Sequence, residues 1–169
     1  MFCVTRIAGG TDVALKAFDS LFRLFCRCIF ASSTAVVAPS LLITDDDRDF
    51  RETLRDMFEP RGFHLLTAGD GEEAVEILRH ETVNVALFDM HMPRLNGLDA
   101  IRRLREFRLP PTWILLSAEA DEQLIAEARE AQVFDVLRKP VTRDRVIDVV
   151  QQALDVSFGT PNWRGLLGS

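Results

Sequence analysis

The chain has 169 residues, of which 47% are hydrophobic, enough for one ordinary domain with a real core and a modest extension. Its net charge of −6 is unevenly spread, because residues 1–40 carry four Lys/Arg against two Asp/Glu, whereas residues 41–169 carry 16 against 24. An acidic body of this kind argues against nonspecific binding to nucleic acid.

The three cysteines, Cys3, Cys26 and Cys28, all lie within the first 40 residues. An odd count with no second Cys or His pair at ligand spacing fits neither a disulfide framework nor a zinc site. The longest apolar stretch is interrupted by Arg23 and Arg27 and falls short of the ~20 residues needed to span a bilayer. We therefore expect free thiols in a reducing compartment and a cytoplasmic protein.

Residues 1–40 are predicted to form an N-terminal extension that contains an amphipathic helix. The simplest interpretation is a loosely ordered or loosely docked segment. A basic amphipathic helix can also lie on an anionic membrane or dock on a partner protein. A secretory signal fits least, because arginines break the apolar stretch. The apolar side comprises Phe18, Leu21, Phe22, Phe25 and Ile29, and the polar side comprises Lys16, Ser20, Arg23 and Arg27.

From Leu41 onward, short apolar runs alternate with amphipathic stretches of helical period, which is the pattern of repeated βα units. Runs such as VNVALF and WILL are almost uniformly apolar, as expected for strands buried on both faces of a parallel sheet. We expect one α/β domain over 41–156 and a tail over 157–169. The predicted strands lie near 41–45, 64–68, 83–89, 112–117 and 133–138.

The five predicted helices show apolar residues at helical spacing. Turn signals agree, since Gly62 ends the first helix, Asp70-Gly71 starts the second and Asn96-Gly97 opens the third. The apolar positions are Phe50, Leu54, Met57 and Phe58; Ala74, Ile77 and Leu78; Leu98, Ile101 and Leu104; Leu124, Ile125 and Ala128; and Val146, Val149, Val150 and Leu154.

Four polar sites follow the ends of apolar runs: the triplet 45–47, Asp89, Ser117 and Lys139. In a parallel α/β sheet, the carboxyl ends of the strands converge on one crevice, so these side chains are expected to meet. Asp45 and Asp46 repel each other unless a cation neutralises them, and hard oxygen ligands favour Mg²⁺, with Mn²⁺ as the alternative.

Asp47 and Asp49 are better explained by the start of the following helix, where the helix dipole favours negative charge. Asp89 closes an apolar strand some seven residues before the next helix, which makes a capping role a poor explanation. A carboxylate beside a metal can attack a phosphoryl donor and form an acyl phosphate. Ser117 and Lys139 would then bind the phosphoryl oxygens. Pro140 makes the Lys139-Pro140 bond a candidate cis peptide.

The segments LLITDDD, FDMHMPRLNG, LLSAE and RKP, in this order and spacing, resemble the receiver domain of bacterial two-component response regulators over residues 41 to about 155. The resemblance implies a flavodoxin-like, doubly wound, five-stranded parallel sheet of order 2-1-3-4-5. It implies Asp89 as the phosphoacceptor; Asp45, Asp46, Asp89 and the backbone carbonyl of His91 as Mg²⁺ ligands; Ser117 as the switch hydroxyl; and Lys139 as the phosphate-sensing lysine.

Two features of the sequence concern how the signal would be transmitted and how long the phosphoryl group would last. Family members often carry an aromatic switch residue three positions before the lysine, where this chain has Val136, and Phe134 is expected on the same sheet face but two residues farther along. His91 and Glu119 occupy positions that border the path of the hydrolytic water in this family. They are therefore either lifetime-tuning residues or ordinary solvated loop residues.

These observations predict a cytoplasmic phosphoprotein of a two-component phosphorelay, a self-modifying aspartyl-phosphate switch and not an enzyme with separate substrate turnover. A sensor histidine kinase, a phosphotransfer protein or a small acyl phosphate would supply the phosphoryl group. Output would pass to an unknown downstream protein through the face formed by the fourth helix, the strand at 133–138 and the fifth helix. No DNA-binding output domain is expected.

Two alternatives belong to other functional classes. A haloacid-dehalogenase-like phosphatase also uses a strand-end Asp, a Ser/Thr, a Lys and Mg²⁺, and its Asp-x-Asp signature superficially matches residues 45–47. It expects Thr or Val where this chain has Asp49, and it gives no reason for Asp89. The other alternative is a receiver-shaped scaffold that works without phosphorylation.

Overall fold

The computed structural model describes residues 38–105 and 110–158, which lie in one compact unit. The amphipathic helix predicted within residues 1–40 lies outside the described residues. A five-stranded parallel sheet has the order β2-β1-β3-β4-β5, which confirms the predicted 2-1-3-4-5 topology. The strands are β1 (Ser40–Thr44), β2 (His64–Ala68), β3 (Val85–Asp89), β4 (Thr112–Ser117) and β5 (Asp135–Arg138).

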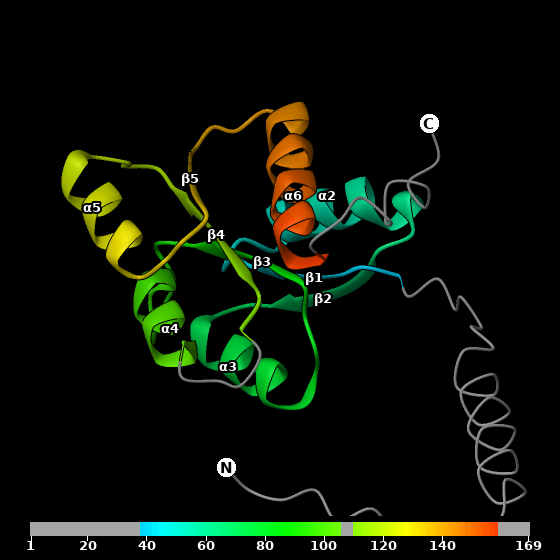
Figure 1. Cartoon of the computed structure of the whole chain (residues 1–169), viewed down its shortest axis with the longest axis horizontal. Helices are drawn as coiled ribbons and strands as arrows, with labels where there is room; N and C mark the ends of the chain where they lie inside the picture. Colours follow the sequence, from blue (N-terminus) through cyan, green and yellow to red (C-terminus); the bar gives the residue numbers. More distant parts are fainter. Residues whose placement is uncertain (1–37, 106–109, 159–169) are drawn as a thin grey trace, which may run out of the picture. The chain divides into compact units, whose positions relative to one another are not determined.

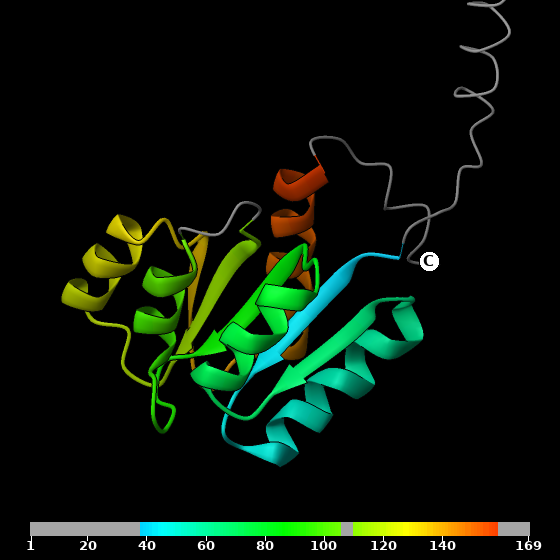
Figure 2. The same cartoon turned by 90° about the horizontal axis from the view of Figure 1, so that it is seen from below.

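Helices cover both faces of this sheet. Helices α2 and α6 lie on one side, and α3 and α4 lie on the other, with α5 at the β5 edge (Figure 1). Figure 2 looks onto the face covered by α3 and α4, with α6 behind the sheet. The helices are α2 (Arg48–Phe58), α3 (Gly71–His80), α4 (Gly97–Leu104), α5 (Glu122–Glu130) and α6 (Arg143–Phe158), and a short 3₁₀ helix, η1 (Glu59–Arg61), follows α2. None of the described helices combines the length and apolar character that crossing a bilayer requires.

Alternation along the strands divides the core into two layers. Leu41 and Ile43 face the layer formed with α2 and α6, whereas Leu42 faces the layer formed with α3, α4 and α5. All three are fully buried, and each contributes about 1.5–3 kcal/mol by leaving water. The central strands β1 and β3 are buried along their whole length because both faces are covered.

Two strands are shorter than the sequence predicts. The β3 ladder begins at Val85, one residue after Asn84, whose side-chain Oδ1 accepts from the Ser40 amide at 2.8 Å. The β5 ladder begins at Asp135, since the Val133 amide still donates to the Ala128 carbonyl of the preceding helix at 2.9 Å. Both differences lie at the amino ends of the strands, away from the predicted site.

Capping residues at the helix starts fix the loops that follow the carboxyl ends of the strands. Asp47 accepts hydrogen bonds from the amides of Asp49 and Phe50, which confirms its predicted role at a helix start. Asp70 and Asn96 cap α3 and α4 in the same way. Such caps contribute about 1 kcal/mol each and fix where the chain turns from strand into helix. The loops after β1, β2 and β3 are therefore short and held at their helical ends.

Candidate functional site

Three carboxylates meet at the carboxyl edge of the sheet. Oxygen atoms of Asp45, Asp46 and Asp89 lie within 4.8 Å of one another. Asp45 follows β1 and Asp89 ends the neighbouring β3, so the strand pairing brings them together. Asp45 is 1% exposed and Asp89 4% exposed, whereas Asp46 faces solvent. Buried like charges at this spacing are costly without a cation, and oxygen-only donors suit a hard divalent ion.

Lys139 supplies one positive charge to this cluster. Its Nζ lies 2.6 Å from Oδ2 of Asp45 and 2.6 Å from Oδ1 of Asp89. The same ammonium lies 4.6 Å from the centre of the Phe50 ring, which shields it from water on one side. The Lys139-Pro140 peptide bond is cis. The lysine thus reaches the site from the end of β5 and pairs with both buried carboxylates.

The pKa values of this pair follow from burial and hydrogen bonding. Burial raises the pKa of Asp45, and the hydrogen bonds from Lys139 and from the Asp47 amide offset this only in part. Burial alone would lower the pKa of Lys139, but its hydrogen bonds to Asp45 and Asp89 outweigh that cost, so its pKa is raised. Lys139 therefore stays charged at neutral pH.

Backbone amides orient the two buried carboxylates, and an arginine holds the backbone of Asp45. The Asp47 amide donates to Oδ1 of Asp45 at 2.9 Å, and the His91 amide donates to Oδ2 of Asp89 at 2.8 Å. The guanidinium of Arg51 donates to the backbone carbonyl of Asp45. Each buried carboxylate thus has one oxygen held by a neighbouring amide and the other facing Lys139.

The loop after Asp89 folds back onto its own strand. The Gly97 amide donates to the Met90 carbonyl at 3.2 Å, and the Met90 amide donates to the Leu116 carbonyl at 2.7 Å. A Cβ on Gly97 would lie 2.2 Å from the Asp89 carbonyl oxygen, so only glycine fits. This close approach fixes the start of α4 against the end of β3.

Ser117 is fully buried at the end of β4, one residue past Leu116, which pairs with Asp89 in the sheet. Its hydroxyl donates to the Glu119 carbonyl at 2.8 Å and accepts from the Glu119 amide at 3.2 Å. The Lys139 amide donates to the Ser117 carbonyl at 2.8 Å. The hydroxyl is thus satisfied by its own loop and would have to exchange the Glu119 carbonyl for another acceptor in order to act at Asp89.

The two candidate lifetime-tuning residues lie on one side of the site. His91 and Glu119 are both exposed, and they line the same open cavity together with Met90 and Leu124. Further acidic and amide side chains from the α5 region complete this cavity. The structure therefore places His91 and Glu119 together beside the acceptor loop, and their effect on the phosphoryl lifetime stays a prediction.

The aromatic switch position is occupied by a partly buried aliphatic residue. Val136 lies in β5 and lines a cavity that it shares with Phe134, Ile125 and Ala128. Phe134 precedes the strand and is 37% exposed. The two residues line one cavity from different parts of the chain, Val136 within β5 and Phe134 before it.

Several residues around the site carry no sequence signal that separates them from ordinary surface residues. Arg51 holds the Asp45 carbonyl, and Arg94 pairs with the buried carboxylate of Asp70. An arginine on a polar helix face or in a loop is usually solvated. The Arg94–Asp70 pair joins two βα units, and the Arg51 contact depends on how α2 turns back over the end of β1, so both could be found only in three dimensions.

This architecture defines a class of protein. A doubly wound α/β domain carries a buried aspartate at the end of a central strand, two aspartates after the neighbouring strand, a buried serine and a half-buried lysine at one edge. This is the arrangement of a phosphoryl-accepting signalling domain. The family model of the response regulator receiver domain matches residues 41–151, and the chain belongs to this family, as the receiver domain of a two-component response regulator.

Known proteins of this family resemble the chain over its described part. The transcriptional regulatory protein CpxR of Escherichia coli K12 is 34% identical over 100 residues, which cover 59% of this chain and 42% of CpxR. The transcriptional regulatory protein PdtaR of Mycobacterium tuberculosis H37Rv is 31% identical over 121 residues, covering 71% of this chain and 58% of PdtaR. The chain thus spans less than two thirds of the length of these relatives.

A solved structure shows the same fold. The CheX–CheY–BeF₃–Mg²⁺ complex from Borrelia burgdorferi aligns with a TM-score of 0.63 and 29% identity, covering 68% of this chain and 87% of the matched chain.

Proposed function

We propose that the protein is a phosphorylation-controlled switch in which Asp89 accepts a phosphoryl group. One observation carries this proposal: Asp89 is a nearly buried carboxylate with two acidic neighbours within 4.8 Å and a lysine at 2.6 Å. A structural role does not require such a concentration of like charge at a strand end. The arrangement is suited to a nucleophile whose reaction is controlled by a bound cation.

A divalent cation fits this donor set. Asp45, Asp46 and Asp89 would hold Mg²⁺ or Mn²⁺, with the backbone carbonyl of His91 as a further ligand. Bound there, the metal would offset the negative charge of the transferring phosphoryl group. The similar CheY of Borrelia burgdorferi, solved in a complex with BeF₃ and Mg²⁺, supports this choice.

Transfer of the phosphoryl group to Asp89 needs no reactant besides the phosphoryl donor. A carboxylate oxygen of Asp89 forms a bond to phosphorus while the bond from phosphorus to the donor breaks. The electron pair leaves with the donor, which is the imidazole of a phosphohistidine or the carboxylate of an acyl phosphate. Lys139 then lies within reach of the new phosphoryl oxygens, and Ser117 exchanges the Glu119 carbonyl for one of them.

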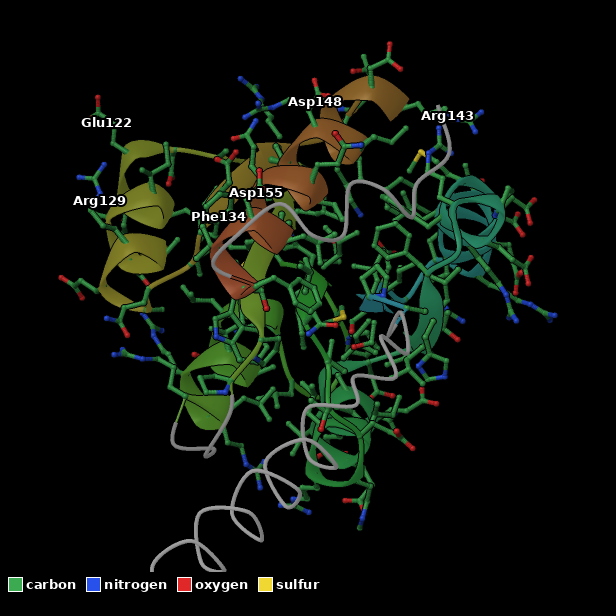
Figure 3. The ribbon with its side chains drawn as sticks, turned by 45° about the vertical axis from the view of Figure 1, so that its right-hand side comes forward. Glu122, Arg129, Phe134, Arg143, Asp148 and Asp155 are labelled. Carbon is green, nitrogen blue, oxygen red and sulfur yellow. The ribbon has the colours of Figure 1, made fainter. Side chains whose placement is uncertain are left out.

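The proposed partners are a sensor histidine kinase or phosphotransfer protein upstream and an unknown protein downstream. Downstream contact would use the face formed by α5, β5 and α6. These three elements are the fourth helix, the last strand and the fifth helix that the sequence predicts as the output face. Figure 3 shows Glu122 and Arg129 on α5 and Asp148 on α6, with Phe134 between the two helices. This mixture of charge around an exposed apolar side chain suits reversible protein contact.

His91 and Glu119 are proposed to set the phosphoryl lifetime. Both lie on the cavity beside the acceptor loop, where water would approach the acyl phosphate. Since the group is transferred to and lost from the protein itself, the activity is that of a cytoplasmic switch without separate substrate turnover.

The test is to incubate the chain with acetyl phosphate and Mg²⁺ and to locate the label by mass spectrometry. We expect the label on Asp89, none in Asp89→Asn, and normal labelling in Asp56→Asn, which removes an exposed carboxylate of α2. Label on Asp45 with phosphate turnover would favour a haloacid-dehalogenase-like phosphatase, and an absence of label at saturating donor would favour a scaffold.

A further inference from the structure

The loop that follows Asp89 contains a strained turn centred on Arg94. The Leu95 amide donates to the Pro93 carbonyl at 2.8 Å, which closes a turn of three residues. Arg94, at its centre, has a φ of 66°, a left-handed conformation that an arginine rarely adopts. Three-residue turns of this hand are rare and strained, and such strain persists only where surrounding contacts enforce it.

The contact that enforces the turn is an ion pair to another βα unit. The guanidinium of Arg94 contacts Oδ2 of Asp70, whose side chain is only 5% exposed, and lies 3.9 Å from Oε2 of Glu72. Oδ1 of Asp70 already accepts from the amides of Glu72 and Glu73 at 2.8 and 3.0 Å. Arg94 therefore satisfies the remaining oxygen of a buried carboxylate, which is costly to leave without a partner.

The same loop packs directly on the start of α3. A Cβ on Gly71 would lie 2.5 Å from the Leu95 carbonyl oxygen and 3.0 Å from the Leu95 Cβ, so only glycine allows the loop to lie this close. The loop is thus held at two points on α3, through Arg94 on Asp70 and through Leu95 on Gly71. His91 lies three residues before Arg94 on this segment, directly after the acceptor strand.

We propose that Arg94 is a positioning residue for the metal site. By closing on Asp70, it fixes the loop that carries the His91 carbonyl, and so sets the affinity of the site formed with Asp45, Asp46 and Asp89. This inference rests on the proposed function, because it takes the His91 carbonyl as a metal ligand. Loss of outer contacts of this kind weakens metal binding by about 10-fold or more.

The test measures Mn²⁺ binding by electron paramagnetic resonance, with no phosphoryl donor present. We expect Arg94→Met and Arg94→Gly each to weaken Mn²⁺ binding about 10-fold, and Arg94→Lys to restore part of the loss because it keeps the charge. Arg94→Gly is the decisive variant, since glycine relieves the strain at a positive φ while removing the guanidinium. A purely structural role predicts that this variant is at least as stable and binds Mn²⁺ normally.

Two controls separate the interpretations. Arg103→Met removes an exposed arginine of α4 and should leave Mn²⁺ affinity unchanged. Asp70→Asn keeps a capping side chain, and its effect should not add to that of Arg94→Met if both act through one contact. Wild-type Mn²⁺ affinity in Arg94→Met and Arg94→Gly overturns the positioning role and leaves the proposed function intact. Failure of the wild-type protein to bind Mn²⁺ overturns the proposed metal site itself.

Discussion

The carboxyl edge of the sheet and the α5–β5–α6 face differ in how tightly their side chains are held. At the carboxyl edge, Asp45, Asp89 and Ser117 are buried, and each polar group has a partner within hydrogen-bonding distance. On the α5–β5–α6 face, Ile125 is 40% exposed and Phe134 37% exposed. The edge is therefore determined by internal contacts, whereas the face is available to other molecules.

This difference implies that the carboxyl edge and the α5–β5–α6 face serve different purposes within one small domain. Chemistry at an acidic site needs atoms fixed to a fraction of an ångström, which only packed elements provide. Contact with a partner needs an accessible surface with side chains that can adjust. Substitutions at the edge should therefore change stability and metal or phosphoryl chemistry together, and substitutions on the face should change neither.

The largest loss of stability is expected at Gly97, where the backbone packs most closely on the carboxyl edge. In Gly97→Ala, the added methyl group would lie 2.2 Å from the Asp89 carbonyl oxygen, which cannot move without displacing β3. We expect a loss of about 3 kcal/mol in the free energy of unfolding, measured by urea denaturation, and slower labelling of Asp89. Gly69→Ala is the matched control, because its added methyl group would meet nothing closer than a Glu73 carboxylate oxygen at 3.5 Å. Equal losses in the two variants would show that close approach does not fix the loop.

Lys139→Met removes the cation between two buried carboxylates. Because the lysine side chain is 27% exposed, water screens part of the change, and we expect the metal-free protein to lose about 2 kcal/mol. Saturating Mg²⁺ should shrink the difference, since the metal neutralises the same carboxylates. Thermal unfolding with and without Mg²⁺ measures both values, with Arg143→Met, an exposed residue of α6, as the control. A loss that Mg²⁺ does not reduce would contradict this charge argument.

Asp45→Asn should stabilise the metal-free protein by about 1 kcal/mol at neutral pH, which raises its melting temperature by a few degrees. Burial raises the pKa of Asp45, so the stability contributed by its protonated form is present below the ordinary pKa of 3.8 and lost as pH rises through the folded-state pKa. The advantage of the variant should therefore disappear in acid.

Melting curves in a chelator, taken from acidic to neutral pH, test this sign. Asp46→Asn serves as the control, because its exposed carboxylate costs the metal-free fold little. A variant that is less stable than the wild type at neutral pH would refute the assignment of Asp45 as a destabilising buried charge.

The smallest effect is expected on the exposed face. Ile125→Ser should change the free energy of unfolding by less than about 1 kcal/mol and the labelling rate of Asp89 by less than about twofold. Leu124→Ser, at the neighbouring and 9% exposed position of α5, should cost about 3 kcal/mol. Denaturation and acetyl phosphate labelling measure both quantities. A large loss of labelling in Ile125→Ser would mean that the face and the edge are not independent.

Much of the fold could be predicted from the sequence because its signals are local. Uniformly apolar runs identify strands buried on both faces, and Asp70-Gly71 and Asn96-Gly97 mark helix starts that the structure confirms. The convergence of Asp45, Asp46 and Asp89 follows from the parallel topology, in which strand ends share one edge.

The remaining features depend on contacts between distant units. An arginine at a positive φ gives no sequence signal, so the Arg94 turn and its pairing with Asp70 could not be foreseen. The sequence predicts that Lys139 binds phosphoryl oxygens, whereas its bridge between Asp45 and Asp89 emerges only when three strand ends are placed together. The sequence shows that position 136 is a valine and not an aromatic residue, but it does not reveal the cavity beside Val136.

The lysine bridge also determines how the charge of the site changes as the switch operates. Three carboxylates and one ammonium give a formal charge of −2, which one divalent cation cancels and a monovalent cation does not. In the proposed reaction, conversion of Asp89 from a monoanionic carboxylate to a dianionic acyl phosphate would leave a single uncompensated negative charge beside Lys139. The site would thus be neutral with the divalent cation bound and would carry a negative charge once Asp89 is phosphorylated. That added charge would attract nearby donors such as the Ser117 hydroxyl.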